Sequence, residues 1–246
     1  MEKKHSLVKT DVSILLEQIE KSYGDTKILS DVSIHVKQGE LVTILGPSGC
    51  GKSTIFNLIS GLQKADDGIL QVKEAIGYMQ QKDLLLPWKN IIDNIVLPLD
   101  LQGRNKKESR DRALALMDKV GLSGYENKYP AELSGGMRQR ANFLRTFISS
   151  QKILLLDEPF GALDSITKGK MQRWLLDIKE AFDITILFIT HDIEEAILLS
   201  DRIYVLSTKP AKIKKEFKVD FFQKNKKQRF TSEKMLYLKN EILLLL

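Results

Sequence analysis

The chain has 246 residues, of which 43% are hydrophobic and 28% charged, and its formal net charge is +6 at pH 7. This composition supports a sizeable buried core, which excludes wholesale disorder. No stretch reaches the ~18 apolar residues of a membrane-spanning helix, and the basic start lacks the apolar core expected of a signal peptide.

Runs of β-branched and aliphatic residues predict short strands, and helical patterns follow several of them. The predicted strands cover 13–18, 32–36, 41–45, 153–156, 185–189 and 202–206. The predicted helices cover 52–60, 106–120, 136–149, 165–181 and 193–199. Two later strands are unbroken apolar runs, which is typical of a parallel sheet covered on both faces. The alternation predicts an α/β fold, with the mostly helical segment 90–121 inserted into it.

The segment GPSGCGKST at 46–54 matches the phosphate-binding pattern G-x-x-x-x-G-K-[ST]. A predicted strand precedes it and a predicted helix follows it, as the pattern requires. Glycines let backbone N–H groups close around phosphate oxygens, and the positive end of the new helix faces them. Lys52 adds a positive charge for the β- and γ-phosphates, and the Ser53 hydroxyl can bind Mg²⁺. We therefore expect a nucleotide site here.

The segment LSGGMRQR at 133–140 predicts a second helix start, with Ser134 as the N-cap. Gly135 and Gly136 leave bare N–H groups at the positive end of that helix, which is a second potential anion site. Two phosphate sites in one chain are explained if two chains enclose the nucleotide between them. An ordinary capped helix is the alternative interpretation.

The apolar strand at 153–156 ends in two carboxylates, Asp157 and Glu158. Ligands of α/β sheets bind beyond the carboxyl ends of the strands, so both side chains should lie beside the loop at 46–54. One carboxylate can hold a metal ion through water, and the other can polarise an attacking water molecule. His191 follows another buried strand, where it can donate to a γ-phosphate and orient the base.

Nine basic and two acidic residues lie between positions 209 and 229, so this stretch carries the excess positive charge of the chain. A cationic segment can contact nucleic acid or anionic lipid headgroups. A solvated face is the simpler interpretation, and because no nucleic-acid recognition motif accompanies the charge, we expect no nucleic-acid partner. The segment 231–246 predicts a short amphipathic helix.

With these motifs in this order, residues 13–207 resemble the ATP-binding subunit of an ABC transporter. The resemblance implies a P-loop ATPase with a mostly parallel core sheet, an antiparallel β part and a helical insertion at about 90–150. It places this domain at 1–208 and leaves 209–246 as a basic tail with a short helix. It also implies ATP and Mg²⁺ as the ligands.

The resemblance assigns roles to individual residues. Lys52, Glu158 and His191 are the implied catalytic residues, with Glu158 as the base. Mg²⁺ would be bound by Ser53, Gln81 and Asp157, and Asp164 would lie at a dimer interface. The implied nucleotide-binding residues are Tyr23, which stacks on adenine, together with Gly46, Pro47, Ser48, Gly49, Cys50, Gly51, Lys52, Ser53, Thr54, Ser134, Gly135 and Gly136.

Three local expectations depend on details of the sequence. The register of QKDLLLPW at 81–88 favours Gln81 over the adjacent Gln80 as the residue that contacts Mg²⁺ and senses the membrane partner. Trp88 either lines a groove for the coupling helix of a permease or packs in the core. Cys50 is expected to be reactive, because a helix N-terminus lowers the pKa of a thiol.

LLPW at 85–88, EPFGALD at 158–164 and THDIEEAILLSDRI at 190–203 resemble the nitrate/sulfonate/taurine group of importers. The resemblance implies two ATPase subunits, either identical or paralogous, on the cytoplasmic face of the membrane. They would drive a membrane permease through its coupling helix, and a separate substrate-binding protein would deliver the solute. The alternatives are a soluble ABC ATPase without a transport role and a regulatory module that binds ATP without hydrolysing it.

Overall fold

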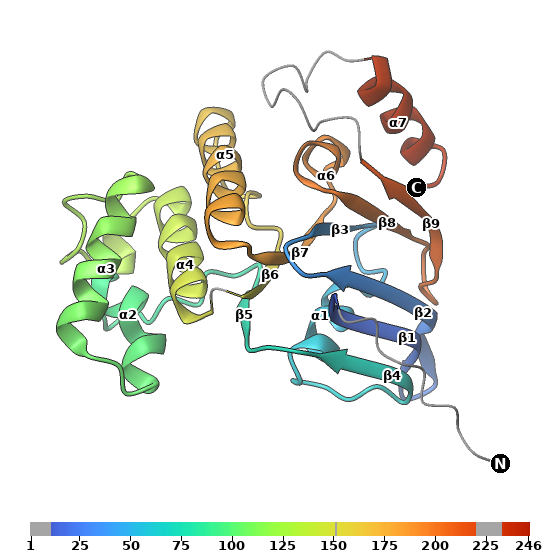
Figure 1. The fold of residues 1–246 in the computed structure, drawn as a ribbon, viewed down its shortest axis with the longest axis horizontal. Coiled ribbons are helices and arrows are strands. Elements are labelled where there is room, and N and C mark those ends of the chain that lie inside the picture. The colour runs from blue at the N-terminus through green and yellow to red at the C-terminus, as the bar shows by residue number, and fades with distance from the viewer. Residues whose placement is uncertain (1–10, 151, 220–232) are drawn as a thin grey trace.

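Two β-sheets and a group of helices make up the computed structural model, which describes residues 11–150, 152–219 and 233–246 (Figure 1). The central sheet has six strands in the order β5-β6-β7-β3-β8-β9. Its neighbouring strands run parallel, except that β9 pairs antiparallel with β8. The bounds of these strands are β3 Leu41–Leu45, β5 Ile76–Met79, β6 Ile153–Asp157, β7 Thr185–Thr190, β8 Arg202–Leu206 and β9 Ile213–Lys218.

The second sheet is antiparallel and has three strands in the order β2-β1-β4. Its strands are β1 Val12–Tyr23, β2 Thr26–Lys37 and β4 Asp67–Val72. In Figure 1 this sheet lies across α1 from the central sheet, and the helices α2, α3 and α4 lie together at the opposite side of the molecule.

Most helices begin at a side chain that accepts hydrogen bonds from the first turn, as N-caps do. These caps are Asn90 for α2, Asn105 for α3, Ser134 for α4, Asp164 for α5 and Asp192 for α6. The helices are α1 Lys52–Ile59, α2 Ile91–Leu101, α3 Lys106–Lys119, the 3₁₀ turn η1 Pro130–Glu132, α4 Gly135–Ser149, α5 Ser165–Phe182, α6 Ile193–Leu199 and α7 Glu233–Leu243.

The unbroken apolar strands are buried on both faces, as their sequences predict. Leu154 and Leu156 of β6 pack with α2, α4 and α5, whereas Ile153 and Leu155 pack with α1 and the antiparallel sheet. The alternation arises because successive side chains of a strand point to opposite faces. The central sheet is therefore the layer on which both halves of the core are built.

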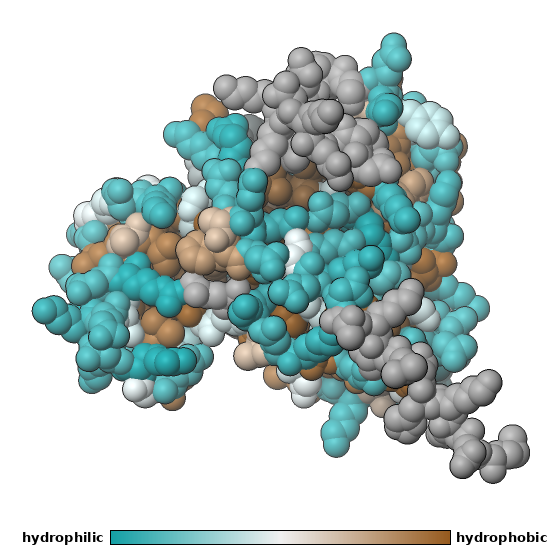
Figure 2. Space-filling model, in the orientation of Figure 1, coloured by the Kyte–Doolittle hydropathy of each residue, from teal (hydrophilic) through white to brown (hydrophobic). Residues whose placement is uncertain are grey.

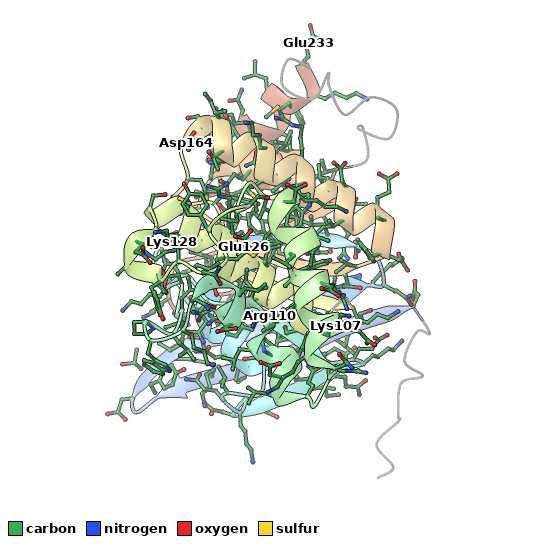
Figure 3. All side chains as sticks on the ribbon, turned by 90° about the vertical axis from the view of Figure 1, so that its left-hand side faces the viewer. Lys107, Arg110, Glu126, Lys128, Asp164 and Glu233 are labelled. Atoms are coloured by element: carbon green, nitrogen blue, oxygen red, sulfur yellow. The ribbon has the colours of Figure 1, made fainter. Side chains whose placement is uncertain are left out.

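The inserted helices carry most of their charge outward. Arg110 of α3 pairs with Asp93 of α2 at 2.6 Å on the outer side of this group, where Lys107 also lies (Figure 3). Figure 2 shows a mostly hydrophilic surface over the inserted helices, interrupted by smaller hydrophobic areas. None of the described helices combines the length and the apolar character that crossing a bilayer requires.

The α/β fold, the mostly parallel sheet, the antiparallel part and the helical insertion predicted from the sequence are confirmed. Three strands were not predicted, namely β4, β5 and β9. β4 and β9 are exposed along much of their length, and four of the six residues of β9 are charged, which hides the usual strand pattern. β9 and α7 both come from the segment 209–246, and the structure places them against β8 and α6. The stretch 220–229 of that basic segment lies outside the described residues.

Candidate functional site

The predicted site residues meet at the carboxyl ends of β3, β6 and β7, where the loops of an α/β sheet usually bind ligands. A cavity of about 400 Å³ opens there. Its lining combines the phosphate loop with the end of β6 and with parts of β2 and the β8–β9 turn. The lining residues are Tyr23, Ile28, Ser48, Gly49, Gly51, Lys52, Ser53, Thr54, Gln81, Asp157, Glu158 and Lys209.

The loop at 46–51 turns sharply from β3 into α1, and glycine makes this turn possible. Gly51 has a φ angle of +122°, which residues with side chains rarely adopt. A Cβ atom on Gly51 would lie 3.0 Å from both Ile28 Cγ2 and Leu29 Cδ2. The loop can therefore approach β2 this closely, and bring the N–H groups at the start of α1 to the cavity, because position 51 has no side chain.

Lys52 extends along the inside of this loop. Its Nζ atom donates to the carbonyl oxygens of Gly46 at 2.7 Å and Pro47 at 2.8 Å. Ser48, Gly49 and Thr54 line the same part of the cavity. The arrangement places one ammonium group and several backbone amides around a volume that suits phosphate oxygens.

Ser53 and Asp157 bring two oxygen ligands together. Ser53 Oγ, on α1, donates to Asp157 Oδ2 at 3.0 Å. Burial raises the pKa of Asp157, while the hydrogen bond from Ser53 lowers it and the charge of Glu158 raises it further. The Gln81 carboxamide lines the same cavity. A hydroxyl, a carboxylate and an amide are the kinds of ligand that Mg²⁺ takes beside phosphate oxygens.

The described residues contain no cluster of three or more His, Cys, Asp or Glu side chains that would bind a metal ion by themselves. A magnesium ion at Ser53 and Asp157 would therefore complete its coordination with phosphate oxygens and water. This fits the reluctance of Mg²⁺ to give up all of its water and its preference for substrate phosphates over all-protein sites.

Glu158 adopts an unusual backbone conformation that directs its side chain into the cavity. Its φ angle is +47°, which costs on the order of 1 kcal/mol for a residue with a side chain. Its N–H donates to Ile189 O at 2.9 Å, and Gln139 Nε2 donates to its carbonyl oxygen at 3.2 Å. These bonds to β7 and α4 hold the strained turn in place.

Both carboxylate oxygens of Glu158 have partners from other predicted site residues. Gln81 Nε2 donates to Oε2 at 3.1 Å, and His191 Nδ1 lies 3.2 Å from Oε1. The structure thus brings Gln81, which the sequence register favoured over Gln80, to the carboxylate. His191 remains 62% exposed, so its ring can face a ligand in the open side of the site.

Tyr23 lies at the mouth of the cavity, at the end of β1, and is 45% exposed. Its hydroxyl donates to Gln63 Oε1, and Lys21 Nζ lies 5.6 Å from the ring centroid. The ammonium of Lys21 thus lies over one face of the ring, and the part of Tyr23 that stays exposed suits a stacking surface for a planar base.

The second predicted anion site lies elsewhere. Ser134 Oγ accepts from Met137 N at 3.3 Å, so the predicted N-cap is confirmed. A Cβ atom on Gly136 would lie 3.2 Å from Leu163 Cδ2, in the segment before α5. Asp164 caps α5 at the edge of the molecule (Figure 3). Within the described chain, positions 134–136 lie outside the lining of the cavity.

The expected reactivity of Cys50 is wrong. The side chain is 2% exposed and packs in the core beside Leu206 and Gly46. Burial raises the pKa of its thiol, and this effect outweighs the lowering by Lys52. The helix N-terminus could not activate a thiol that the loop turns toward the core, away from water.

Trp88 is 71% exposed, so core packing, the simpler of the two interpretations left open for it, is wrong. It lies in the segment 81–88 that connects β5 to α2. Two arginines of α4 hold the start of this segment. Arg138 Nε contacts Asp83 Oδ2 at 2.9 Å, and Arg145 donates to the carbonyl oxygens of Asp83 and Leu84 at 2.9 and 2.8 Å.

Two residues of the site could not be found from local motifs. Gln139 joins α4 to the turn after β6, because it donates to Glu158 O and accepts from Ala162 N at 3.2 Å. Lys209 lines the cavity from the turn between β8 and β9. The excess of positive charge at 209–229 was visible in the sequence, but its first lysine had no motif to connect it with the phosphate loop.

Comparison with known proteins adds to this geometry. The model of a family described as ABC transporter matches residues 29–161. The formylaminopyrimidine import ATP-binding protein ThiZ of Halalkalibacterium halodurans is 46% identical over 200 residues, which are 80% of each chain. The taurine import ATP-binding protein TauB of Yersinia pestis is 40% identical over 210 residues, which are 82% of each chain.

A solved structure is similar to most of the chain. It is the dimeric structure of a post-hydrolysis state of the ATP-binding cassette MJ0796, bound to ADP and Pi. The TM-score is 0.78 and the sequences are 31% identical. The match covers 85% of this chain and 100% of the other.

Proposed function

The chain belongs to the ABC transporter family of ATPases, and from this membership we propose that it is the ATP-hydrolysing subunit of an importer. The observation that carries the proposal is the cavity that combines a phosphate loop with the carboxylate of Glu158. A site that only stored nucleotide would need the loop but not an oriented carboxylate.

ATP would occupy the cavity with its base at Tyr23 and its phosphates within the loop at 46–54. The N–H groups at the start of α1 and the ammonium of Lys52 face the phosphate volume. Lys52 would turn its donors from the carbonyl oxygens of Gly46 and Pro47 toward the β- and γ-phosphates. Ser53, Asp157 and Gln81 would hold Mg²⁺, which offsets negative charge on the phosphates when bound.

Glu158 would act as the base for the attacking water molecule. Its carboxylate is held between Gln81 and His191, so a water molecule hydrogen-bonded to it has a defined direction. His191 would donate to the γ-phosphate and so help to orient the reacting groups. Catalysis of this kind consists mainly of positioning and of electrostatic stabilisation of the phosphoryl group.

A second ATPase subunit would complete the site. Ser134, Gly135 and Gly136 form a helix N-terminus outside the cavity of their own chain, so they are available to phosphates bound elsewhere. We call residues 134–136 the signature segment. The similar cassette is dimeric, which supports a dimer in which each signature segment faces the nucleotide of the other subunit. Asp164 would lie at that interface.

A permease would bind the same cassette from the membrane side. The relatives named above are import ATP-binding proteins for taurine and formylaminopyrimidine, which supports import of a small solute of the nitrate/sulfonate/taurine type. Exposed Trp88 lies in the same segment as Gln81, so a coupling helix seated there would be connected to Glu158 through Gln81. The subunit would then lie on the cytoplasmic face of the membrane, with a substrate-binding protein acting through the permease.

The substitution Glu158→Gln tests the proposal. The variant should bind ATP with nearly unchanged affinity, because the carboxylate is not part of the phosphate loop. Its turnover should fall by at least about 100-fold, since an amide is a poor general base. ATP should also convert it into a stable dimer, which size-exclusion chromatography with ATP and with ADP would detect.

Glu74→Gln is the matched control, because Glu74 is exposed in the turn before β5. This variant should hydrolyse ATP at the rate of the original chain. Unimpaired turnover by the Glu158→Gln variant would show that another group is the base.

A further inference from the structure

The turn between β8 and β9 brings a second lysine to the nucleotide cavity. Lys209 lines this cavity together with Ile28, Ser48 and Gly49. The predicted phosphate-binding motif does not include it, and it lies more than 150 positions away along the chain. Its place in the site is a result of the fold.

Hydrogen bonds within the turn fix its shape. Ser207 N donates to Lys212 O, and Lys212 N donates to Ser207 Oγ, both at 2.9 Å. The Ser207 hydroxyl also donates to Thr208 O at 2.8 Å and to Pro210 O at 3.3 Å. The backbone on both sides of Lys209 is therefore held, and only the side chain has freedom to move.

The turn is also attached to the antiparallel sheet. Ala211 N donates to Ile28 O at 2.8 Å, and Ser30 N donates to Ala211 O at 3.0 Å. Ile28 lines the cavity and lies directly beside Gly51, in the space that a side chain at position 51 would need. Lys209 thus approaches the phosphate loop from the side of β2, a strand of the sheet that also carries Tyr23. Asp157 and Glu158 reach the loop from another element, because they belong to β6 and the turn after it.

The charge of Lys209 reaches the phosphate loop. Burial raises the pKa of Cys50, and Lys52 and Lys209 both act in the opposite direction. The base of the turn is close to the loop as well, because a Cβ atom on Gly46 would lie 3.1 Å from Leu206 Cβ, at the end of β8. Two ammonium groups therefore act on the same short loop.

Lys209 has its ammonium group available for a ligand. Among the residues that the structure describes, no carboxylate forms an ion pair with it. Two lysines of the adjacent β9 already have partners within the chain, since Lys214 donates to Leu245 O and Lys215 pairs with Glu241 at 3.1 Å. Lys209 is exposed and lines a cavity that already suits anions.

We propose that Lys209 is a nucleotide-binding residue whose ammonium group contacts the phosphates nearest the ribose, which ATP and ADP share. The inference rests on the proposed function, because it concerns the same nucleotide site. It assigns Lys209 to binding of the nucleotide and not to the chemical step, since Glu158 and the metal ligands come from other elements.

Lys209→Ala in the full-length chain tests the assignment. The dissociation constants of ATP and ADP, measured by titration with fluorescent analogues, should both rise about three- to tenfold, as expected for one exposed contact with a charged phosphate. The KM for ATP should rise by a similar factor while kcat stays nearly constant. The effect should shrink at high salt, because salt screens exposed charges.

Three variants sharpen the test. Lys209→Arg should bind like the original chain, because it keeps the charge, and Lys209→Glu should bind more weakly than Lys209→Ala. Lys212→Ala is the matched control, since Lys212 is an exposed lysine of the same turn that does not line the cavity. It should leave both dissociation constants unchanged.

The failures of the two proposals can be distinguished. If the original chain binds neither ATP nor ADP, the proposed function is wrong and the assignment of Lys209 fails with it. If the original chain binds both but Lys209→Ala binds equally well, only the assignment of Lys209 is wrong. An equal loss in Lys212→Ala, or a loss confined to ATP, would also overturn it.

Discussion

Cys50 shows how one residue in a ligand-binding loop can face away from the ligand. Gly49 and Gly51 beside it line the nucleotide cavity, but its side chain packs in the core, where its sulfur and Leu206 both lie next to Gly46. Glycine at positions 49 and 51 allows the chain to turn on both sides of Cys50. The loop thereby presents backbone amides to one side and an apolar thiol to the other.

We expect Cys50 to react slowly with thiol reagents in the folded chain. Burial raises its pKa, so little thiolate forms near neutral pH, and the reagent has no open path to the sulfur. Labelling by a maleimide, followed by mass spectrometry, should be at least about tenfold slower in buffer than in denaturant. Cys50→Ser provides the background, and equal rates in both conditions would contradict the buried position.

The residues that line the cavity could largely be predicted from the sequence, whereas their contacts could not. The motifs identified Lys52, Asp157 and Glu158, because each stands next to a recognisable strand or loop. The left-handed conformation of Glu158 and its contact with Gln139 depend on how β6, β7 and α4 pack. Lys209 was missed because its distance from the loop is short only after folding.

At the scale of elements, the segment after β5 is attached to α4, the helix that begins with the signature glycines. Arg138 contributes a partly exposed ion pair with Asp83. Arg145 donates to two backbone carbonyl groups of the segment and also to Asn142 Oδ1. The segment that carries Gln81 and the helix that carries the signature are therefore connected by side chains and not only by packing.

The two kinds of contact should differ in their contribution to stability. Arg145→Met should lower the free energy of unfolding by about 1–3 kcal/mol, because it leaves the carbonyl groups of Asp83 and Leu84 without their donor. Asp83→Asn should lower it by less than about 1 kcal/mol, since the ion pair is partly exposed. Urea denaturation measures the free energy of unfolding of both variants. A larger loss in Asp83→Asn than in Arg145→Met would show that the ion pair contributes more than the bonds to the carbonyl groups.

The elements differ in how well the sequence reveals them. β3 and β8 were predicted with the bounds that the structure gives, because each has only one polar residue among its five, Thr43 in β3 and Arg202 in β8. Four of the six residues of β9 are charged, and β9 pairs with the sheet through one strand only, so its sequence resembles a solvated segment. The predicted boundary between 208 and 209 falls inside the turn that connects these two strands.

At the scale of the whole molecule, exposed Trp88 lies in the same segment as Gln81, which contacts the carboxylate of Glu158. Trp88 follows Gln81 by seven positions in the sequence, and Gln81 contacts Glu158. A large exposed aromatic side chain is typical of a residue that contributes strongly to binding a partner. The family and the relatives point to a membrane permease as this partner.

Trp88→Ala should therefore separate two activities. The ATPase rate of the isolated variant should equal that of the original chain. When the variant is reconstituted in liposomes with the permease encoded beside it and a solute-loaded binding protein, the stimulation of its ATPase rate should be at least about fivefold lower. Leu62→Ala is the control, because Leu62 is also an exposed apolar residue but follows α1. Full stimulation of the Trp88→Ala variant would place the coupling helix elsewhere.

The two hydrogen bonds between Ala211 and the strand β2 have a consequence for how much chain the catalytic unit needs. They join the sheet that carries Tyr23 to the sheet that carries the phosphate loop, and they come from a residue after the last recognisable motif. A minimal fragment cut just behind that motif would lose this attachment, together with the strand that covers the edge of β8. A fragment that keeps this backbone pairing therefore has to extend beyond Ala211, well past residues 29–161 that the family model matches.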